Sequence, residues 1–86
     1  MAHVHVTILG LFRLDTGLKE LDAEAGKVKD LYPVLLRKAR ELNPNTTITA
    51  ADVDSCIVLV NGKQSKKGTR LFEGDEVHLM SPVCGG

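Results

Sequence analysis

One apolar stripe constrains the fold of this chain more than any other feature. Between Val28 and Leu42, apolar residues recur at intervals of three and four, which predicts an amphipathic helix with one face for packing. The stripe consists of Val28, Leu31, Leu35, Ala39 and Leu42. The other apolar runs are short and resemble strands, so we expect this helix to pack against a sheet.

Pro33 constrains where the helix begins. A helix that started at Lys27 would place Pro33 in its interior, at a cost of about 3 kcal/mol. With Asp30 as the N-cap, Pro33 falls at the third helical position, where its missing N–H has no intrahelical partner. We therefore expect an Asp30 cap, or a distorted first turn that loosens before Pro33. Residues 43–45 end the helix, and residues 45–55 are predicted to be polar and irregular, with Ile48 and Val53 as anchors.

Short apolar segments on both sides of the helix predict strands. Val4, Val6 and Ile8 alternate with polar residues, and the run 56–60 is continuously apolar and β-branched, as in a buried strand. Asn61-Gly62 follows it as a strong two-residue hairpin signal. The predicted strands are residues 3–9, 18–23 (the weaker one), 56–60, 63–65 and 76–80.

The order of these segments predicts an α+β roll, a mixed four- to five-stranded sheet packed on one main helix. Tight turns make antiparallel hairpins, whereas a helical crossover joins strands in parallel. We expect the first and last strands to lie side by side at the sheet centre. Val77 and Leu79 should face the core, and His78 and Met80 the other way. Residues 1–80 would then form the domain and residues 81–86 a flexible tail that leaves from mid-sheet.

Composition narrows the classes of partner. The chain has 11 Lys and Arg against 11 Asp and Glu, and its aromatics are one Tyr and two Phe. Nucleic-acid affinity rests on neutralising phosphates, so a nucleic-acid partner is not expected. No N-terminal apolar h-region and no long apolar run is present, and we expect a cytoplasmic protein with no membrane association. Cys56 and Cys84 match no zinc or redox spacing and are interpreted as reduced thiols.

The last six residues, Ser81-Pro82-Val83-Cys84-Gly85-Gly86, do not fit a core. Pro82 lacks an N–H and ends the strand near Ser81, and two terminal glycines have no side chain to pack. Such an end could thread a narrow channel in another protein, and its ionised carboxylate could attack the α-phosphate of a nucleotide. The alternative is an ordinary frayed terminus or a cloning remnant.

Several stretches resemble one family. Arg13 and Gly17 fall where its first hairpin has an arginine and a glycine, and 28–31 resembles its helix opening. Val60-Asn61-Gly62 resembles its central hairpin. The remaining likenesses are Leu71, the run Phe72-Glu73-Gly74-Asp75-Glu76-Val77 and the tail Ser81-Pro82-Val83-Cys84-Gly85-Gly86. In this order they resemble the MoaD/ThiS family of ubiquitin-like (β-grasp) sulfur carriers, above all the small subunit of molybdopterin synthase. Pro33 and a long 43–55 connection depart from the pattern.

This resemblance implies that the chemistry resides in Gly86. An adenylating enzyme of the ubiquitin-activating type would use ATP to convert the Gly86 carboxylate to an acyl-adenylate. A cysteine-derived persulfide would then leave a C-terminal thiocarboxylate. Residues 81–85 would occupy the partner's channel, and the carrier would hold no cofactor of its own.

The resemblance leaves several sulfur acceptors open. The tail favours molybdopterin (molybdenum or tungsten cofactor) synthesis, in which the tail would enter a large synthase subunit. Other sulfur carriers serve thiamine, cysteine or tRNA thiolation, and some ubiquitin-like proteins modify other proteins. An alternative of another class is an interaction module whose terminus is never activated. No nucleophile–base pair, phosphate loop or paired acids is found in the sequence, so we do not expect an enzyme.

The outward residues of the central strands have two interpretations. Leu9, His78 and Met80 would form a docking face, because apolar residues on the outer side of a sheet indicate a partner. His3, His5 and His78 could also share that side as metal ligands, but no carboxylate or cysteine is evident as a fourth ligand. We therefore expect no metal site. Cys84 could capture the activated acyl group, although any small residue would serve at that position.

Overall fold

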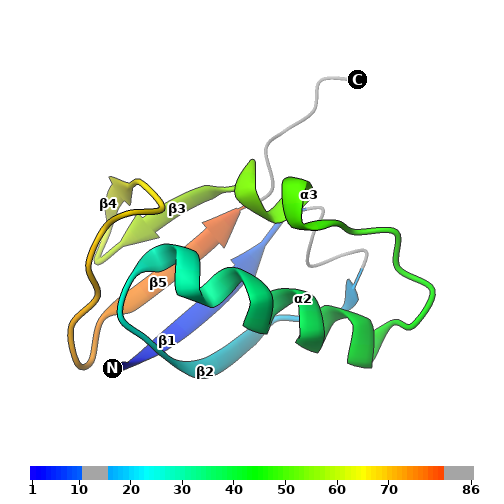
Figure 1. The fold of residues 1–86 in the computed structure, drawn as a ribbon, viewed down its shortest axis with the longest axis horizontal. Coiled ribbons are helices and arrows are strands. Elements are labelled where there is room, and N and C mark those ends of the chain that lie inside the picture. The colour runs from blue at the N-terminus through cyan, green and yellow to red at the C-terminus, as the bar shows by residue number, and fades with distance from the viewer. Residues whose placement is uncertain (11–15, 81–86) are drawn as a thin grey trace.

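The computed structural model describes residues 1–10 and 16–80, which form a mixed sheet with helices on one face (Figure 1). The elements are β1 (Ala2–Leu9), β2 (Glu20–Ala25), the 3₁₀ turn η1 (Val28–Asp30), α2 (Leu31–Leu42), α3 (Ala50–Asp54), β3 (Ile57–Val60), β4 (Lys63–Ser65) and β5 (Glu76–Met80). The predicted roll is therefore confirmed, with one main helix and five strands. The predicted tail, residues 81–86, lies outside the described residues.

The sheet has the strand order β2-β1-β5-β3-β4, so the first and last strands lie side by side at its centre. They run in parallel, and the other neighbouring strands pair antiparallel. Because parallel strands end at the same edge, Leu9 and Met80 are register partners at their carboxyl ends. Figure 1 shows both arrows pointing the same way beneath α2. The chain thus leaves β5 from the middle of the sheet, as the sequence predicts.

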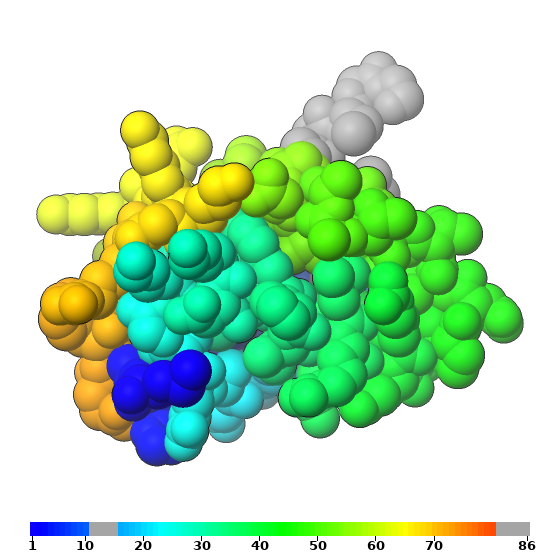
Figure 2. Space-filling view, viewed as in Figure 1, coloured from blue at the N-terminus to red at the C-terminus, as the bar shows by residue number. Residues whose placement is uncertain are grey.

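The core lies between the sheet and the helices. Alternate residues of the two central strands face it and are buried, among them Ile8, Val77 and Leu79. The helical stripe covers them with Leu31 and Leu35, which are 1% and 0% exposed. Figure 2 shows this side of the molecule, where the helical residues (teal to green) hide most of the sheet. Leu42, the last residue of the predicted stripe, is 57% exposed, because α2 extends beyond the core there.

The start of the helix shows both predicted features, Asp30 at the N-cap position and a distorted first turn. Pro33 is the third residue of α2, and the preceding turn has 3₁₀ geometry. Asp30 occupies the N-cap position, but its side chain does not cap α2. Its Oδ2 instead accepts hydrogen bonds from the backbone N–H groups of Gly26 and Lys27, at 3.2 and 3.0 Å. Asp30 therefore fixes the turn before the helix, where two N–H groups lack helical partners.

A second helix corrects the prediction of an irregular 45–55 segment. Residues Ala50–Asp54 form α3, and Thr49 is its N-cap. The backbone N–H of Asp52 donates to Thr49 Oγ1 (3.3 Å), while Asp52 Oδ2 accepts from the Thr49 N–H (2.9 Å), which is a capping box. The predicted anchors are confirmed, since Val53 is fully buried and Ile48 packs against the core.

Two strand predictions also need correction. The second strand lies at Glu20–Ala25 rather than 18–23, so that Leu21, Ala23 and Ala25 face the core and Leu18 is buried just before it. The run 56–60 is not buried throughout. β3 begins at Ile57, which is 38% exposed, while Val58 and Val60 are buried. Among the described residues, helices cover one face of this sheet, so a continuous apolar run there has one exposed side.

The Asn61-Gly62 hairpin is confirmed and is tied to the entry of β5. Both residues have positive φ (52° and 85°), which a two-residue turn of this kind requires. Asn61 Nδ2 donates to Asp75 Oδ1 (2.9 Å), and Asn61 Oδ1 accepts from the Glu76 N–H (3.0 Å). Gly74 also has positive φ (84°) in the turn before β5. The Gly74-Asp75-Glu76 sequence therefore positions the start of β5 for pairing with its neighbouring strands.

Candidate functional site

The outer face of the central strands carries a row of apolar side chains. Leu9, Met80 and Ile57 are consecutive register partners across β1, β5 and β3, on the side opposite the helices. All three are partly or well exposed, Ile57 by 38%. The next row contains Thr7, His78 and Leu59, also in register. The predicted docking residues Leu9, His78 and Met80 are thus brought together, at the edge where β5 ends.

Sequence analysis missed Ile57 and Leu59 as members of this face. Both belong to the continuous apolar run that was interpreted as a strand buried on both sides. Period-two alternation would have assigned them to the face of Met80 and His78, because residues directly opposite each other in a sheet share a face. We define the docking face as Leu9, Ile57, Leu59, His78 and Met80.

A strip of acidic side chains borders the docking face on β2. Glu20, Asp22 and Glu24 are register partners of Thr7, His5 and His3. His3 Nε2 lies 2.6 Å from Glu24 Oε1, and His5 Nδ1 lies 2.8 Å from Asp22 Oδ1. The turn before β5 adds a fourth carboxylate, with His3 Nδ1 3.3 Å from Glu73 Oε2, and His5 Nε2 lies 3.5 Å from Glu20 Oε2.

These contacts shift two pKa values. The hydrogen bond to Asp22 raises the pKa of His5 above its ordinary value, with smaller contributions from the charges of Asp22, Glu76 and Glu20. The backbone N–H of His3 donates to Glu73 Oε1 at 3.0 Å, and this bond lowers the pKa of the Glu73 carboxyl group. Both shifts favour the charged form of the group, protonated His5 and ionised Glu73.

The same contacts test the alternative interpretation that His3, His5 and His78 are metal ligands. Sequence analysis saw no carboxylate near the histidines, but pairing of β1 with β2 supplies several. They occupy opposite nitrogens of each imidazole ring rather than converging on one point. Within residues 1–10 and 16–80, no group of three or more His, Cys, Asp or Glu side chains could hold a metal ion.

Cys56 precedes β3 and is half-buried. Its Sγ donates to the Asp52 carbonyl oxygen at 3.4 Å. Burial, with a contribution from Asp52, raises the pKa of the thiol to about 11. Because the thiolate is the reactive form of cysteine, Cys56 is poorly suited to nucleophilic chemistry at neutral pH.

The remaining predicted site residues lie outside the described part of the chain. These are Gly86 and the tail residues Ser81, Pro82, Val83, Cys84 and Gly85. The structure does describe the residue that precedes them. Met80 is the last residue of β5 and lies in the middle of the docking-face row. No helix among residues 1–10 and 16–80 is long and apolar enough to cross a bilayer.

A family comparison decides the identity. The ThiS family profile matches residues 6–86, nearly the whole chain. The chain belongs to the ThiS family. Members are ubiquitin-like sulfur carriers, and the five-stranded mixed sheet with one main helix is their β-grasp fold. A search of curated protein sequences finds no match.

Solved structures agree with the ThiS-family fold. The small archaeal modifier protein 1 of Methanosarcina acetivorans is 27% identical, with a TM-score of 0.73, and the match covers 100% of this chain and 98% of that one. That of Haloferax volcanii is 22% identical, with a TM-score of 0.71 and coverages of 96% and 100%. A chain in the Helicobacter pylori complex of molybdopterin-converting factor subunits 1 and 2 is 23% identical, with a TM-score of 0.60 and coverages of 98% and 99%.

Proposed function

We propose that this ThiS-family chain carries sulfur as a thiocarboxylate on Gly86 and delivers it in molybdopterin synthesis. The observation that supports this proposal is the position of Met80. It ends the central strand β5 within the apolar row Leu9, Met80 and Ile57, on the face opposite α2 and α3. A partner that docks on this row meets the start of the six-residue segment that ends in Gly86.

The proposed chemistry explains why the terminus needs an enzyme. A carboxylate is a poor acyl donor until one of its oxygens becomes part of a good leaving group. Attack of a Gly86 carboxylate oxygen on the α-phosphate of ATP releases pyrophosphate and forms an acyl-adenylate. A persulfide sulfur then attacks the acyl carbon and expels AMP, and a thiol reductant cleaves the resulting S–S bond to leave the thiocarboxylate. The partner supplies the acids, bases and oxyanion donors.

The choice of molybdopterin rests on two supports. The tail Pro82-Val83-Cys84-Gly85-Gly86 resembles that of the molybdopterin synthase small subunit, and the Helicobacter pylori neighbour is a complex of two molybdopterin-converting factor subunits. A large synthase subunit would then be the sulfur-accepting partner. The likeness to two archaeal modifier proteins supports a second candidate, conjugation of the activated Gly86 to protein amines.

Intact-mass spectrometry tests the carrier chemistry. After incubation with an adenylating enzyme of the same cell, ATP and a persulfide donor, the chain should gain about 16 Da, the difference between sulfur and oxygen. A variant that lacks Gly86, and one with an extra residue after it, should show no such gain over their own starting masses and should keep the wild-type Tm. An unchanged wild-type mass, with an enzyme that thiolates its own known carrier, would contradict the proposal and favour a non-activated interaction module.

A matched pair of substitutions tests the docking face. Ile57 is 38% exposed on that face, and Leu42 is 57% exposed at the end of α2, away from it. Ile57→Glu should slow adenylation at least about tenfold, because a carboxylate at the centre of an apolar contact is left unpaired. Leu42→Glu should not change the rate. Equal rates for both variants, with unchanged Tm, would show that docking does not use this face.

A further inference from the structure

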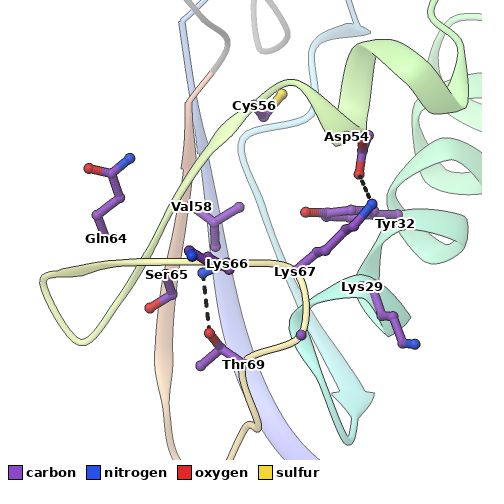
Figure 3. Close-up of a pocket in the computed structure, with 11 residues that line it drawn as sticks. Lys29, Tyr32, Asp54, Cys56, Val58, Gln64, Ser65, Lys66, Lys67 and Thr69 are labelled. Atoms are coloured by element: carbon purple, nitrogen blue, oxygen red, sulfur yellow. Dashed lines mark hydrogen bonds and ion pairs between the residues drawn. The ribbon is translucent and has the colours of Figure 1, made fainter.

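A hollow of about 930 Å³, lined by charged, polar and apolar groups, lies on the helical side of β3, away from the docking face (Figure 3). Its walls are the start of β3, the 64–69 segment and the first turns of the helical region. Figure 3 shows Tyr32 of α2 on one side and Ser65, Lys66 and Thr69 on the other. Val58 reaches it from β3 and is 3% exposed. Neither the proposed sulfur chemistry nor the docking face uses this hollow.

The hollow has an excess of positive charge. Lys29, Lys66 and Lys67 line it, together with one carboxylate, Asp54. Lys67 Nζ lies 3.6 Å from Asp54 Oδ1, and Figure 3 shows this side chain extending across to Asp54 and Tyr32. Among the described residues, no carboxylate forms an ion pair with Lys29 or Lys66. One pair is thus neutralised, and Lys29 and Lys66 remain without a carboxylate partner. Figure 3 shows the Lys29 side chain pointing away from the hollow, so its flexible stem must turn to bring the ammonium group to a ligand.

The uncharged lining adds hydrogen-bond donors and an apolar wall. Burial raises the pKa of the Tyr32 phenol, with smaller contributions from Asp54 and Cys56, so its hydroxyl is a donor at neutral pH. Thr69 Oγ1 accepts from the Lys66 N–H at 3.2 Å, which leaves the hydroxyl proton of Thr69 for another acceptor. The Tyr32 ring and Val58 form the apolar part. The site therefore suits an acceptor-rich anion attached to an apolar body.

We propose that this hollow binds a small organic phosphate monoester. A phosphate monoester carries a charge of about −2 near neutral pH, which matches the ammonium groups of Lys29 and Lys66. The lysines take the phosphate as point charges, and Tyr32 and Val58 contact the organic part. A hollow of about 930 Å³ is within the range of small-molecule sites and far larger than inorganic phosphate needs.

Titration of the full chain with AMP, followed by amide NMR, tests the proposal. The amide signals of Tyr32, Val58, Gly68 and Thr69 should shift and saturate, with a Kd of about 1 mM or tighter. Adenosine, which lacks the phosphate, and inorganic phosphate, which lacks the body, should each bind at least about tenfold more weakly. Absence of saturation, or equal affinity for AMP and inorganic phosphate, would overturn the proposal. Tighter binding of a phosphoserine peptide than of AMP would also overturn it, in favour of a phosphoprotein partner.

Substitutions at Gly68 test directly whether charge in the hollow controls AMP binding. Gly68 lines the hollow, its φ is not positive, and a Cβ built there meets no atom within 4 Å, so side chains are tolerated. Gly68→Asp should weaken AMP binding at least tenfold through charge repulsion, whereas Gly68→Asn, of the same shape, should not. Lys66→Gln should also weaken binding, and Lys63→Gln, on β4 outside the hollow, should leave it unchanged. Equal losses for Asp and Asn, or for Lys66→Gln and Lys63→Gln, would contradict the charge argument.

Discussion

The two faces of β5 differ although their residues alternate along one short strand. On the helical side, Val77 and Leu79 are fully buried. On the other side, His78 and Met80 are partly exposed, in rows shared with β1 and β3. The helical side is aliphatic throughout, whereas the outer side combines apolar, imidazole and carboxylate groups. The comparison shows that burial against α2 holds the fold together, and that the outer side is available for recognition.

The two faces also differ in how sequence changes should act on them. A substitution on the helical side leaves a cavity that packed neighbours cannot close, so its cost is in stability. A substitution on the outer side changes contacts with solvent or with a partner. A partner that buries Met80 and Ile57 would therefore gain apolar contact without any rearrangement of the core.

The largest expected effect is on the free energy of unfolding, and it should differ between the two faces of β5. Leu79→Ala should lower the free energy of unfolding by about 3 kcal/mol, because Leu79 is fully buried. Met80→Ala, one residue later on the outer face, should cost less than about 1 kcal/mol. Urea unfolding of both variants with an unchanged m-value gives the comparison. Similar losses for the two would mean that the outer face is also part of the stabilising core.

The fold was predictable because its strongest signals agree. The helical stripe, the alternating first strand and the Asn61-Gly62 turn each allow one local structure, and together they allow one topology. α3 was missed because five residues with Val53 as their buried member show no helical period. The capping box of Thr49 and Asp52 was the available signal. The second strand was displaced by two residues because Ala23 and Ala25 are weakly apolar, although both face the core.

The candidate site was predictable only in part. Leu9, His78 and Met80 follow from strand alternation and from placing β1 beside β5. The carboxylates around His3 and His5 come from β2 and from the turn before β5, so they depend on strand register that the sequence pattern did not fix. The roles of Gly86 and the tail residues come from the resemblance and stay predictions.

A smaller effect tests whether the buried face depends on the short helix that sequence analysis missed. Thr49→Ala removes the N-cap of α3 and should destabilise the chain by about 1 kcal/mol. Fraying of α3 would expose Val53, so the backbone amides of Val53 and Ser55 should exchange faster with solvent. Thr47→Ala, at an exposed position before the helix, is the control and should change neither quantity. Unchanged amide exchange in Thr49→Ala would show that packing of Val53 alone holds α3.

The smallest expected effect lies on the exposed strip that borders the docking face. The Asp22 hydrogen bond raises the pKa of His5 in the folded chain above its unfolded value of 6.5. The resulting stabilisation is fully present below pH 6.5 and is lost as the pH rises through the folded pKa. NMR titration of the His5 ring protons should give a midpoint above 6.5 in the wild type and a lower one in Asp22→Asn. Asp54→Asn, which removes a carboxylate on the helical side, should leave that midpoint unchanged. A His5 midpoint that does not respond to Asp22→Asn would mean that the two side chains do not pair in solution, and that the strip presents its carboxylates to partners unscreened by imidazolium.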